Sequence, residues 1–481
     1  MAYVNKQSLR EEFESIKLEF QSLSEKQKVS PEVAALFRAM MGLFDILIAV
    51  FLERSTRKNA KNSSLPPSQT QKDESFLLSK GSAGKGPQQN DDCFTNFRTH
   101  ESFDTAEVNQ CDTCGEDLSR VSIVDSERRT KIDIVFEKVI THIDAEIKEC
   151  PSCSRRTKGA FPADMPGPLQ YGCGIKAYLL SLLVAQMVSL NRAQKAIKAL
   201  IGSTISEATM LKYVYQLHQS LQQWEHSAVE YLLKQPVIHV DETSMRIDGK
   251  NQWVHVYAAG QVTLKVVHPS RGKEAMEAIG IIPRYDGYII HDCWGSYLSY
   301  DHCGHGLCGS HLLRELTFVV DSNGYAWAAQ MKKLLQETCA TVSKRKRKKL
   351  VAKEYAAIQK RYRSILTRGE KEMPPIPIRK NGQRGKIAKS EAHNLWERLK
   401  TYEVAVLVFA QEANVSFTNN RAERDLRMGK VKQKVSGCFR NATYAQAYCR
   451  ITSYLQTMSG KGINPLIAIQ TVLSGNLSSK G

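Results

Sequence analysis

Hydrophobic and polar positions alternate most clearly in the middle of the chain, where short β-branched runs are separated by turns. Such runs are typical of strands, whereas an apolar period of three to four residues predicts a helix. Asp248-Gly249 is a strong signal for a type I′ hairpin between the first two runs. The pattern predicts strand, strand, strand, helix and strand in the segments VIHVDETSMRI (237–247), QWVHVYAA (252–259), VTLKVVH (262–268), RGKEAMEAIG (271–280) and GYIIHD (287–292).

The first 58 residues follow a heptad-like period instead. Apolar side chains recur at spacings of four and three, and a break containing Pro31 divides them into two sets. Residues 1–58 are expected to form zipper-like helices, either as a coiled coil that joins two chains or packed within the same chain. The seam consists of Leu9, Phe13, Ile16, Phe20 and Leu23, then Val33, Phe37, Met40, Phe44, Leu47 and Phe51.

Changes of composition divide the rest of the chain. Residues 59–105 lack periodic apolar positions and are expected to form a flexible polar linker. Residues 161–235 predict helices joined across a short Gly-Ser-Thr turn, which would form either a helix-turn-helix that reads DNA or a scaffold for the catalytic core. A helical segment is expected at the carboxyl end, over 441–481.

Three acidic residues stand at distinctive points of this pattern. Asp241 lies within the first predicted strand, Asp292 closes the fourth, and Glu423 opens a basic helical segment. Because a lone carboxylate is costly to bury, acids that close apolar strands indicate a bound cation, and three together suit Mg²⁺ or Mn²⁺. Acids on the first and fourth strands of a β-β-β-α-β order correspond to the ribonuclease-H-like arrangement. The long gap before Glu423 predicts a helical insertion, at about 320–405 of a core spanning 236–440.

Each acid also has a purely structural interpretation. Asp241 could cap a turn, and Asp292 could be the N-cap of a helix in WGSYLSY. Asn420 and Glu423 have the spacing of a capping box, in which Glu423 bonds back to the backbone. The order of the acids along the predicted fold favours catalysis, and Glu423 could perform both roles.

Four of the 12 cysteines have the spacing of zinc ligands. The pairs Cys111-x2-Cys114 and Cys150-x2-Cys153 lie on knuckle-like turns, and four thiolates suit tetrahedral Zn²⁺. Residues 106–160 are therefore expected to form a zinc-binding module that holds a DNA-binding domain together and takes no part in catalysis. Paired surface cysteines without metal are the alternative.

A second group of potential ligands follows Asp292, within His302–His311. Cys308 and His311 have the spacing Cys-x2-His, and Arg314 lies one turn further along the same predicted helix. We expect these three residues to support the active site by packing and by positioning phosphate. A second metal site is the alternative.

The charge balance points to an acidic partner. The 481 residues include 67 Lys and Arg against 49 Asp and Glu, a formal net charge of +18, and such an excess is typical of proteins that neutralise DNA phosphates. Residues 177–190, which we take as the longest apolar stretch, are too few to span a bilayer, and the first ten residues lack a secretory signal. These features predict a cytoplasmic, nucleoid-associated protein with no membrane partner.

Several longer phrases are distinctive: Asp241-Glu242-Thr243, HDCWGSY (291–297), CGSHLLREL (308–316) and NNRAERDLRMGKVKQKVSGCFRN (419–441). Together with the zipper, the linker and the cysteine module, they resemble the insertion-sequence 66 (IS66) family of bacterial DDE transposases over nearly the whole chain. Cys293 and Gly295 depart from the commonest family wording, but neither replaces an acid. The resemblance implies that Asp241, Asp292 and Glu423 are the DDE acids.

The resemblance implies an α+β multidomain enzyme that cuts DNA at the ends of its element and joins the 3′-OH ends to target DNA. Asp241 would bridge two Mg²⁺ or Mn²⁺ ions, and each of the other acids would complete one coordination sphere. Expected partners besides DNA are a second copy, through the N-terminal helices, and accessory proteins of the same element. Basic residues on the helix of Glu423 would offset phosphate charge or form a solvated face: Arg421, Arg424, Arg427, Lys430 and Lys432.

Two other functions are compatible with these residues. A relative that has lost catalysis could act as a zinc-dependent DNA-binding protein, and a structure-specific nuclease would cut DNA without joining it. Retention of all three acids favours the transposase.

Overall fold

The computed structural model describes residues 6–26, 28–56, 58–59, 62, 103–132, 137–376 and 389–475. The linker predicted for 59–105 lies almost entirely outside these residues. The chain divides into two compact units, one made of Met1–Gly84 with Gln223–Gln456 and the other of Lys85–Gln222 with Thr457–Gly481. Each unit is described separately below.

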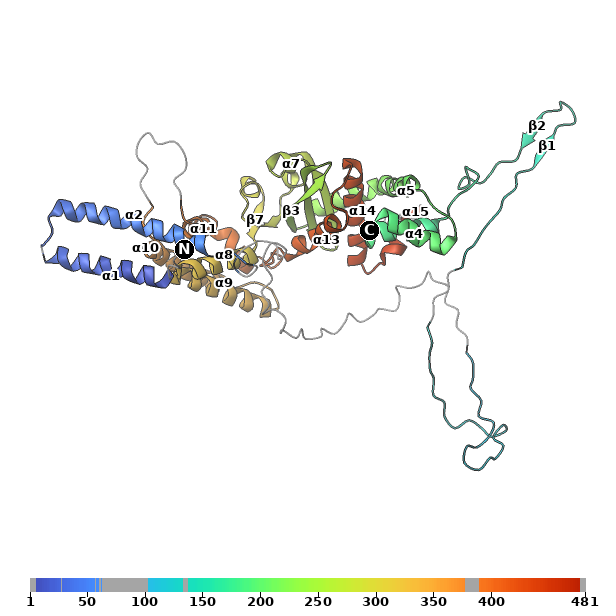
Figure 1. Cartoon of the computed structure of the whole chain (residues 1–481), viewed down its shortest axis with the longest axis horizontal. Coiled ribbons are helices and arrows are strands. Elements are labelled where there is room, and N and C mark those ends of the chain that lie inside the picture. Colours follow the sequence, from blue (N-terminus) through green and yellow to red (C-terminus); the bar gives the residue numbers. More distant parts are fainter. Residues whose placement is uncertain are drawn as a thin grey trace. The chain divides into compact units, whose positions relative to one another are not determined.

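A five-stranded mixed sheet forms the centre of the first unit (Figure 1). The strand order is β5-β4-β3-β6-β7; β3, β4 and β5 are antiparallel neighbours, and β6 runs parallel to both β3 and β7. This confirms the strands expected from the sequence and adds β7, which was not predicted. The bounds are β3 Val237–Ile247, β4 Lys250–Ala259, β5 Val262–His268, β6 Tyr288–His291 and β7 Gly304–Leu307.

The hairpin between β3 and β4 has the predicted turn. Asp248 and Gly249 both have positive φ, 48° and 69°, as a type I′ turn requires, and Ile247 pairs with Lys250 across it. The short turn fixes the register of β3, so it determines which β3 side chains face the core.

Helices cover this sheet and bury its apolar side chains. Helix α6 (Gln222–Leu233) and helix α7 (Lys273–Ile279) contribute to a core with Ile238, Tyr257 and Ile289. Helix α13 (Asn420–Ser436) lies against β3 and β4, and α14 (Ala442–Gly460) follows it. The segment WGSYLSY, expected to be helical, contains only the short 3-10 turn Tyr297–Ser299.

The helical insertion is present and is longer than predicted. It begins directly after β7, and it has its own core around Trp327, Tyr362 and Trp396. Its helices are α8 Gly309–Asn323, α9 Ala326–Lys344, α10 Ala352–Glu372, α11 Glu391–Thr401 and α12 Glu403–Gln411.

The first two helices, α1 (Lys6–Glu25) and α2 (Pro31–Ser55), form an antiparallel hairpin (Figure 1). Phe20 stacks on Phe37 with ring centroids 4.2 Å apart, and Lys17 pairs with Asp45 at 2.6 Å. The end of α2 is anchored to the insertion, because buried Glu53 accepts hydrogen bonds from the backbone N–H groups at the start of α11. The two helices thus pack on each other and on the insertion within one chain, and a coiled coil with a second copy stays a prediction.

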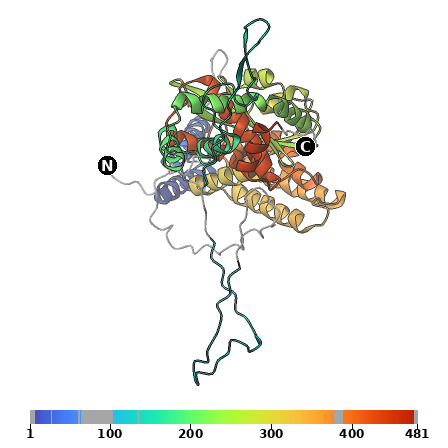
Figure 2. The same cartoon turned by 90° about the vertical axis from the view of Figure 1, so that its right-hand side faces the viewer.

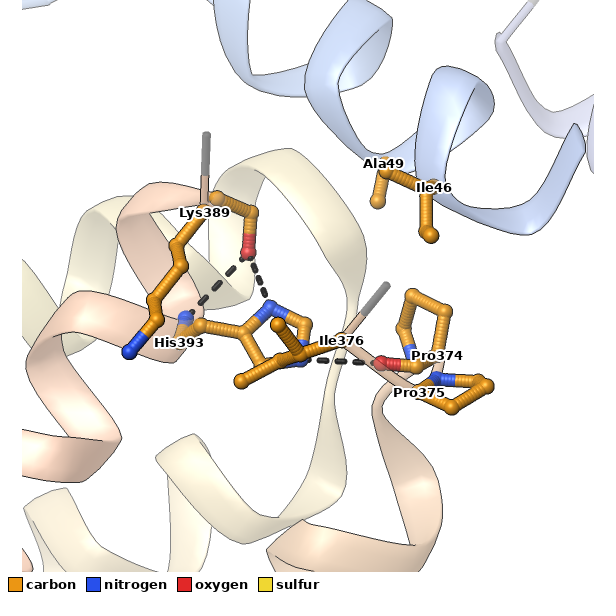
Figure 3. A pocket seen from close by; sticks show the side chains of 8 residues that line it. Ile46, Ala49, Pro374, Pro375, Ile376, Lys389 and His393 are labelled. Atoms are coloured by element: carbon orange, nitrogen blue, oxygen red, sulfur yellow. Dashed lines mark hydrogen bonds between the residues drawn. The ribbon is translucent and has the colours of Figure 1, made fainter. Parts of the chain in front are cut away.

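A small apolar pocket lies between α2 and the segment that precedes α11 (Figure 3). His393 in its wall is held by Ser390 Oγ at 2.7 Å and by the Pro374 carbonyl at 2.9 Å. None of the three acids lines this pocket. It is therefore a packing junction rather than a candidate for the catalytic site.

The second unit contains short helices and one two-stranded arm. The C-terminal helix α15 packs against α3 and α5 (Figure 2). The helical segment before the Gly-Ser-Thr turn is interrupted around Met187, which has a positive φ of 57°. The elements are β1 Ile147–Glu149, β2 Arg156–Lys158, α3 Cys173–Leu180, the π-helical turn Ser181–Ala185, α4 Leu190–Ile201, α5 Glu207–Ser220 and α15 Pro465–Leu473.

Candidate active site

The parallel register of β3 and β6 brings two of the acids to the same level of the sheet. Val237 pairs with Tyr288 and His239 with Ile290, and this register, continued by two residues, sets Asp241 level with Asp292, whose charge acts on Asp241. Asp292 follows the last residue of β6, and its Oδ1 accepts the backbone N–H of Trp294 at 3.0 Å. Strand pairing thus brings two acids that are distant in the sequence to the same end of the sheet.

Glu423 reaches the same place from the first turn of α13. The residue that ties this helix to the sheet is Asn419, which is 2% exposed. Its Nδ2 donates to the Val240 carbonyl at 2.8 Å, its Oδ1 lies 3.0 Å from His239 Nδ1, and its backbone N–H points to Cys308 Sγ at 3.2 Å. Asn419 therefore connects the start of Glu423's helix to the two β3 residues that precede Asp241.

The contacts of Asn419 show that the capping box considered from the sequence is not formed. It is the N-cap of α13, and its side chain makes no capping bond to its own helix because both polar atoms are used across to β3. The capping box expected from Asn420 and Glu423 is consequently wrong. Sequence reasoning missed Asn419, although the Asn-Asn pair before the helix was a visible signal.

The acids influence one another electrostatically. Burial raises the pKa of Asp241 well above its ordinary value, and the negative charges of Glu242, Asp292 and Glu423 raise it further. Burial also raises the pKa of Asp292, while the Trp294 N–H and the charges of Arg271 and Arg398 oppose that rise. A cation bound beside Asp241 and Asp292 would oppose the rise in their pKa, because it favours the charged form of each carboxyl group.

Cys308 and His311 lie beside Glu423, at the start of α8. Their ligand atoms and the Glu423 carboxylate lie within 4.8 Å of one another, and His311 Nδ1 is 3.5 Å from Glu423 Oε1. Within the described part of the chain, no other set of three His, Cys, Asp or Glu side chains is gathered in this way. Burial, and then the charge of Arg314, lower the pKa of His311 to about 4, so the imidazole is neutral at physiological pH.

The remaining histidines of that sequence cluster do not join this group. His302 Nε2 lies 3.1 Å from the Ile282 carbonyl, and His305 lies between His291 and the Tyr300 carbonyl at 3.0 and 2.9 Å. The expected supporting residues Cys308 and His311 thus separate from the other members of the cluster.

The basic residues expected on α13 fall into two classes. Arg421 donates to the carbonyls of Gly260 and Val262, and Lys430 Nζ donates to the Ser244 carbonyl at 2.6 Å, so both hold the helix on the sheet. Partial burial lowers the pKa of Lys432. Of these five basic residues, Arg424 and Arg427 are exposed.

The two cysteine pairs form two copies of the same local turn. Gly115 N–H donates to the Cys111 carbonyl at 2.9 Å, and Ser154 N–H to the Cys150 carbonyl at 2.8 Å. Backbone N–H groups lower the pKa of both Cys111 and Cys150, as suits a thiolate ligand. The four thiols do not come together in the described structure, so the zinc site stays a prediction.

A comparison with protein-family models finds a match, whereas a search of curated proteins finds none. The matching family is the transposase IS66 family, and its model covers residues 168–447, more than half of the sequence. The chain belongs to the IS66 transposase family. The matched region contains the whole five-stranded sheet, the helices between β7 and α13, and all three candidate acids. The resemblance to this family is thereby confirmed over residues 168–447, and DNA is the partner that the family implies.

Proposed function

We propose that this IS66-family protein is a DDE transposase that cuts DNA at the ends of its element and joins the 3′-OH ends to target DNA. The observation that carries the proposal is the convergence of three acids from distant segments. The β3–β6 register brings Asp241 level with Asp292, and Asn419 ties the helix of Glu423 to β3. The charges of three carboxylates, those of Glu242, Asp292 and Glu423, then act on Asp241.

The donor set suits divalent cations. Carboxylate oxygens are preferred by Mg²⁺ and Mn²⁺, and a cation would relieve the mutual repulsion that raises the pKa of Asp241. Two such ions, when bound, would activate the attacking oxygen and stabilise charge on the leaving 3′ oxygen. Asp241, Asp292 and Glu423 would hold them, and neutral His311 offers a nitrogen beside Glu423.

The chain's own residues would orient the reacting groups. Asp241 and Asp292 are fixed by backbone N–H groups at 2.9 and 3.0 Å, from Glu242 and Trp294 respectively. Preorganised carboxylates of this kind lose little free energy when substrate arrives. On the surface of α13, Arg424 and Arg427 would contact the DNA backbone.

Helix α2 is proposed as a contact between two copies of the protein. Leu36, Leu43 and Leu47 are mostly exposed along it, although the hairpin buries part of its seam. By length and composition the segment Pro31–Arg54 could also cross a membrane. Asp45 paired with Lys17 and buried Glu53 bound to α11 favour a helix that packs on protein. The molar mass in solution, measured by light scattering, distinguishes dimer from monomer.

The segment that carries both cysteine pairs, residues 106–160 (the cysteine arm), is proposed to bind structural zinc and to help recognise the element ends. The two turns match, and backbone N–H groups lower the pKa of Cys111 in one and of Cys150 in the other. Each turn would supply two of the four ligands that a tetrahedral site requires. The helix-turn-helix candidate is α4 with α5, joined at Gly202, and accessory proteins of the element could bind beside it.

The decisive experiment is an assay of Mg²⁺- or Mn²⁺-dependent nicking and joining on DNA that carries the element's own ends. We expect nicked and joined products from the wild type and none from Asp241→Ala, with DNA binding retained by both. Nicks without joining of a pre-cut 3′-OH end would instead indicate a nuclease. Binding without any product, even after addition of the element's other proteins, would indicate a non-catalytic DNA-binding protein.

A further inference from the structure

A partly exposed arginine is fixed between the neighbours of two proposed catalytic acids. Arg271 lies in the loop between β5 and α7, and its Nε and Nη2 donate to one oxygen of Glu242, at 2.8 and 2.7 Å. Glu242 follows Asp241 in the chain. The Arg271 guanidinium also stacks on Trp294, with its carbon 4.1 Å from the ring centroid, and Trp294 donates its backbone N–H to Asp292. Arg271 is therefore placed by the residues adjoining both acids.

The surroundings hold the guanidinium rigidly. Trp253 covers it as well, at 4.9 Å from the ring centroid. The second oxygen of Glu242 accepts the Tyr297 hydroxyl at 2.5 Å, so this carboxylate cannot rotate freely. Cation–π contacts and a doubly bonded carboxylate together reduce the conformational entropy that Arg271 would lose on binding an anion.

Arg271 nevertheless remains open to an additional ligand. Its side chain is 39% exposed, whereas that of Glu242 is 1% exposed. Its Nη1 has no hydrogen-bond partner within the described residues. Neutralising the buried Glu242 carboxylate requires neither a fixed orientation beside the acids nor an unused N–H donor at Nη1. Both features are expected if Arg271 also binds a ligand.

We propose that Arg271 donates from Nη1 to a backbone phosphate oxygen of the DNA at the cleavage site, and that Glu242, Tyr297 and the two indoles hold it there. This inference rests on the proposed function, since the phosphate is the one presented to Asp241 and Asp292. The group of carboxylates would otherwise repel the phosphate. A fixed guanidinium offsets that repulsion and orients the phosphate by a directed hydrogen bond.

The test separates phosphate binding from charge balance. We expect Arg271→Gln to lower cleavage of element-end DNA by about 100-fold or more, and Glu242→Gln by only about fivefold, since its amide oxygen still accepts from Arg271. The double variant Glu242→Gln/Arg271→Gln should remain as impaired as Arg271→Gln. Recovery of the double variant to the level of Glu242→Gln would show that Arg271 only neutralises Glu242, and would overturn the proposal.

A second readout does not depend on cleavage. The salt dependence of DNA binding, measured in Ca²⁺ on a duplex carrying the element end, should lose about 0.9 in log–log slope in Arg271→Gln and retain it in Arg271→Lys. The matched control is Arg284→Gln, an exposed arginine between α7 and β6, for which neither cleavage nor slope should change. An unchanged slope in folded Arg271→Gln would overturn the inference. A wild type that binds DNA without cutting it would count against the proposed function and would leave this slope test valid.

Discussion

The sheet core and the cysteine arm both carry candidate metal ligands that are widely separated in the sequence, but the structure brings only the first set near one another. In the core, strand pairing and Asn419 bring the segments of Asp241, Asp292 and Glu423 near enough for the charges of the other two acids to act on Asp241. In the arm, Cys111 and Cys150 each shape a local turn, and the two turns do not combine. Local sequence is thus sufficient for a knuckle, whereas a site with distant ligands needs a source of long-range free energy.

Burial of apolar side chains explains the difference. Ile238, Val240 and Ile289 are fully buried, and their burial offsets the entropy lost when distant strands are ordered. In the arm, Val124 is 98% exposed and Ile132 is 91% exposed. The described residues of the arm therefore form no core that could bring its cysteines together, and bound metal would have to supply that free energy.

The largest effect is expected from removing a core ligand. Asp241→Asn should reduce DNA cleavage by about 1,000-fold or more, because the lost ligand carries several kcal/mol of charge stabilisation. Folding and DNA binding should persist. Asp248→Asn, at the other end of the same strand and compatible with its type I′ turn, is the control and should cleave normally. Equal activity of Asp241→Asn and wild type would show that Asp241 does not belong to the active site.

Loss of the long-range connection should have the next largest effect. Asn419→Ala should lower cleavage by about 100-fold, because a displacement of roughly 1 Å is enough to misalign Glu423. It should also raise the Mg²⁺ concentration needed for half-maximal activity, which a purely structural defect would not do. Asn420→Ala, the exposed neighbour, is the matched control. An unaltered Mg²⁺ requirement would show that Asn419 does not position the acid.

The arm should respond to its own metal without affecting the core. We expect one zinc per wild-type chain and about tenfold or greater loss of zinc affinity in Cys111→Ser, since thiolate ligands dominate such sites. The core's thermal transition should be unchanged, while binding to element ends weakens. Cys173→Ser, an exposed cysteine outside the pairs, should bind zinc normally. Zinc content by atomic emission that is equal in Cys111→Ser and wild type would contradict the four-cysteine site.

The smallest effect concerns stability and pH. Burial and neighbouring carboxylates raise the pKa of Asp241 and Asp292, so the folded metal-free protein binds protons that the unfolded chain has released. Stability without metal should therefore fall as pH rises above the ordinary carboxyl pKa, through the raised values. Asp241→Asn should raise the metal-free Tm at neutral pH, by about 2–4 °C per kcal/mol relieved. Added Mg²⁺ should stabilise the wild type more at higher pH and have little effect on the variant. The opposite trend would show that burial and neighbouring carboxylates do not raise the pKa of Asp241.

Much of the catalytic core could be predicted from the sequence by itself. The β-branched runs predicted strands β3 to β6, Asp248-Gly249 predicted the hairpin, and the family phrases indicated the family and three candidate acids. These features depend on residues close together in the chain, whose backbone preferences act locally. The same reason explains why both cysteine knuckles were recognisable.

Other features were decided only by tertiary structure. The sequence did not reveal β7, the full length of the insertion, or the use of Asn419 across the sheet in place of a capping box. It also assigned Arg421 to DNA, although that side chain binds the carbonyls of Gly260 and Val262. In each case the deciding partner is more than a hundred residues away or is a short strand completed by pairing. Local preference identifies candidate groups, and burial and long-range hydrogen bonding select the partners that they bind.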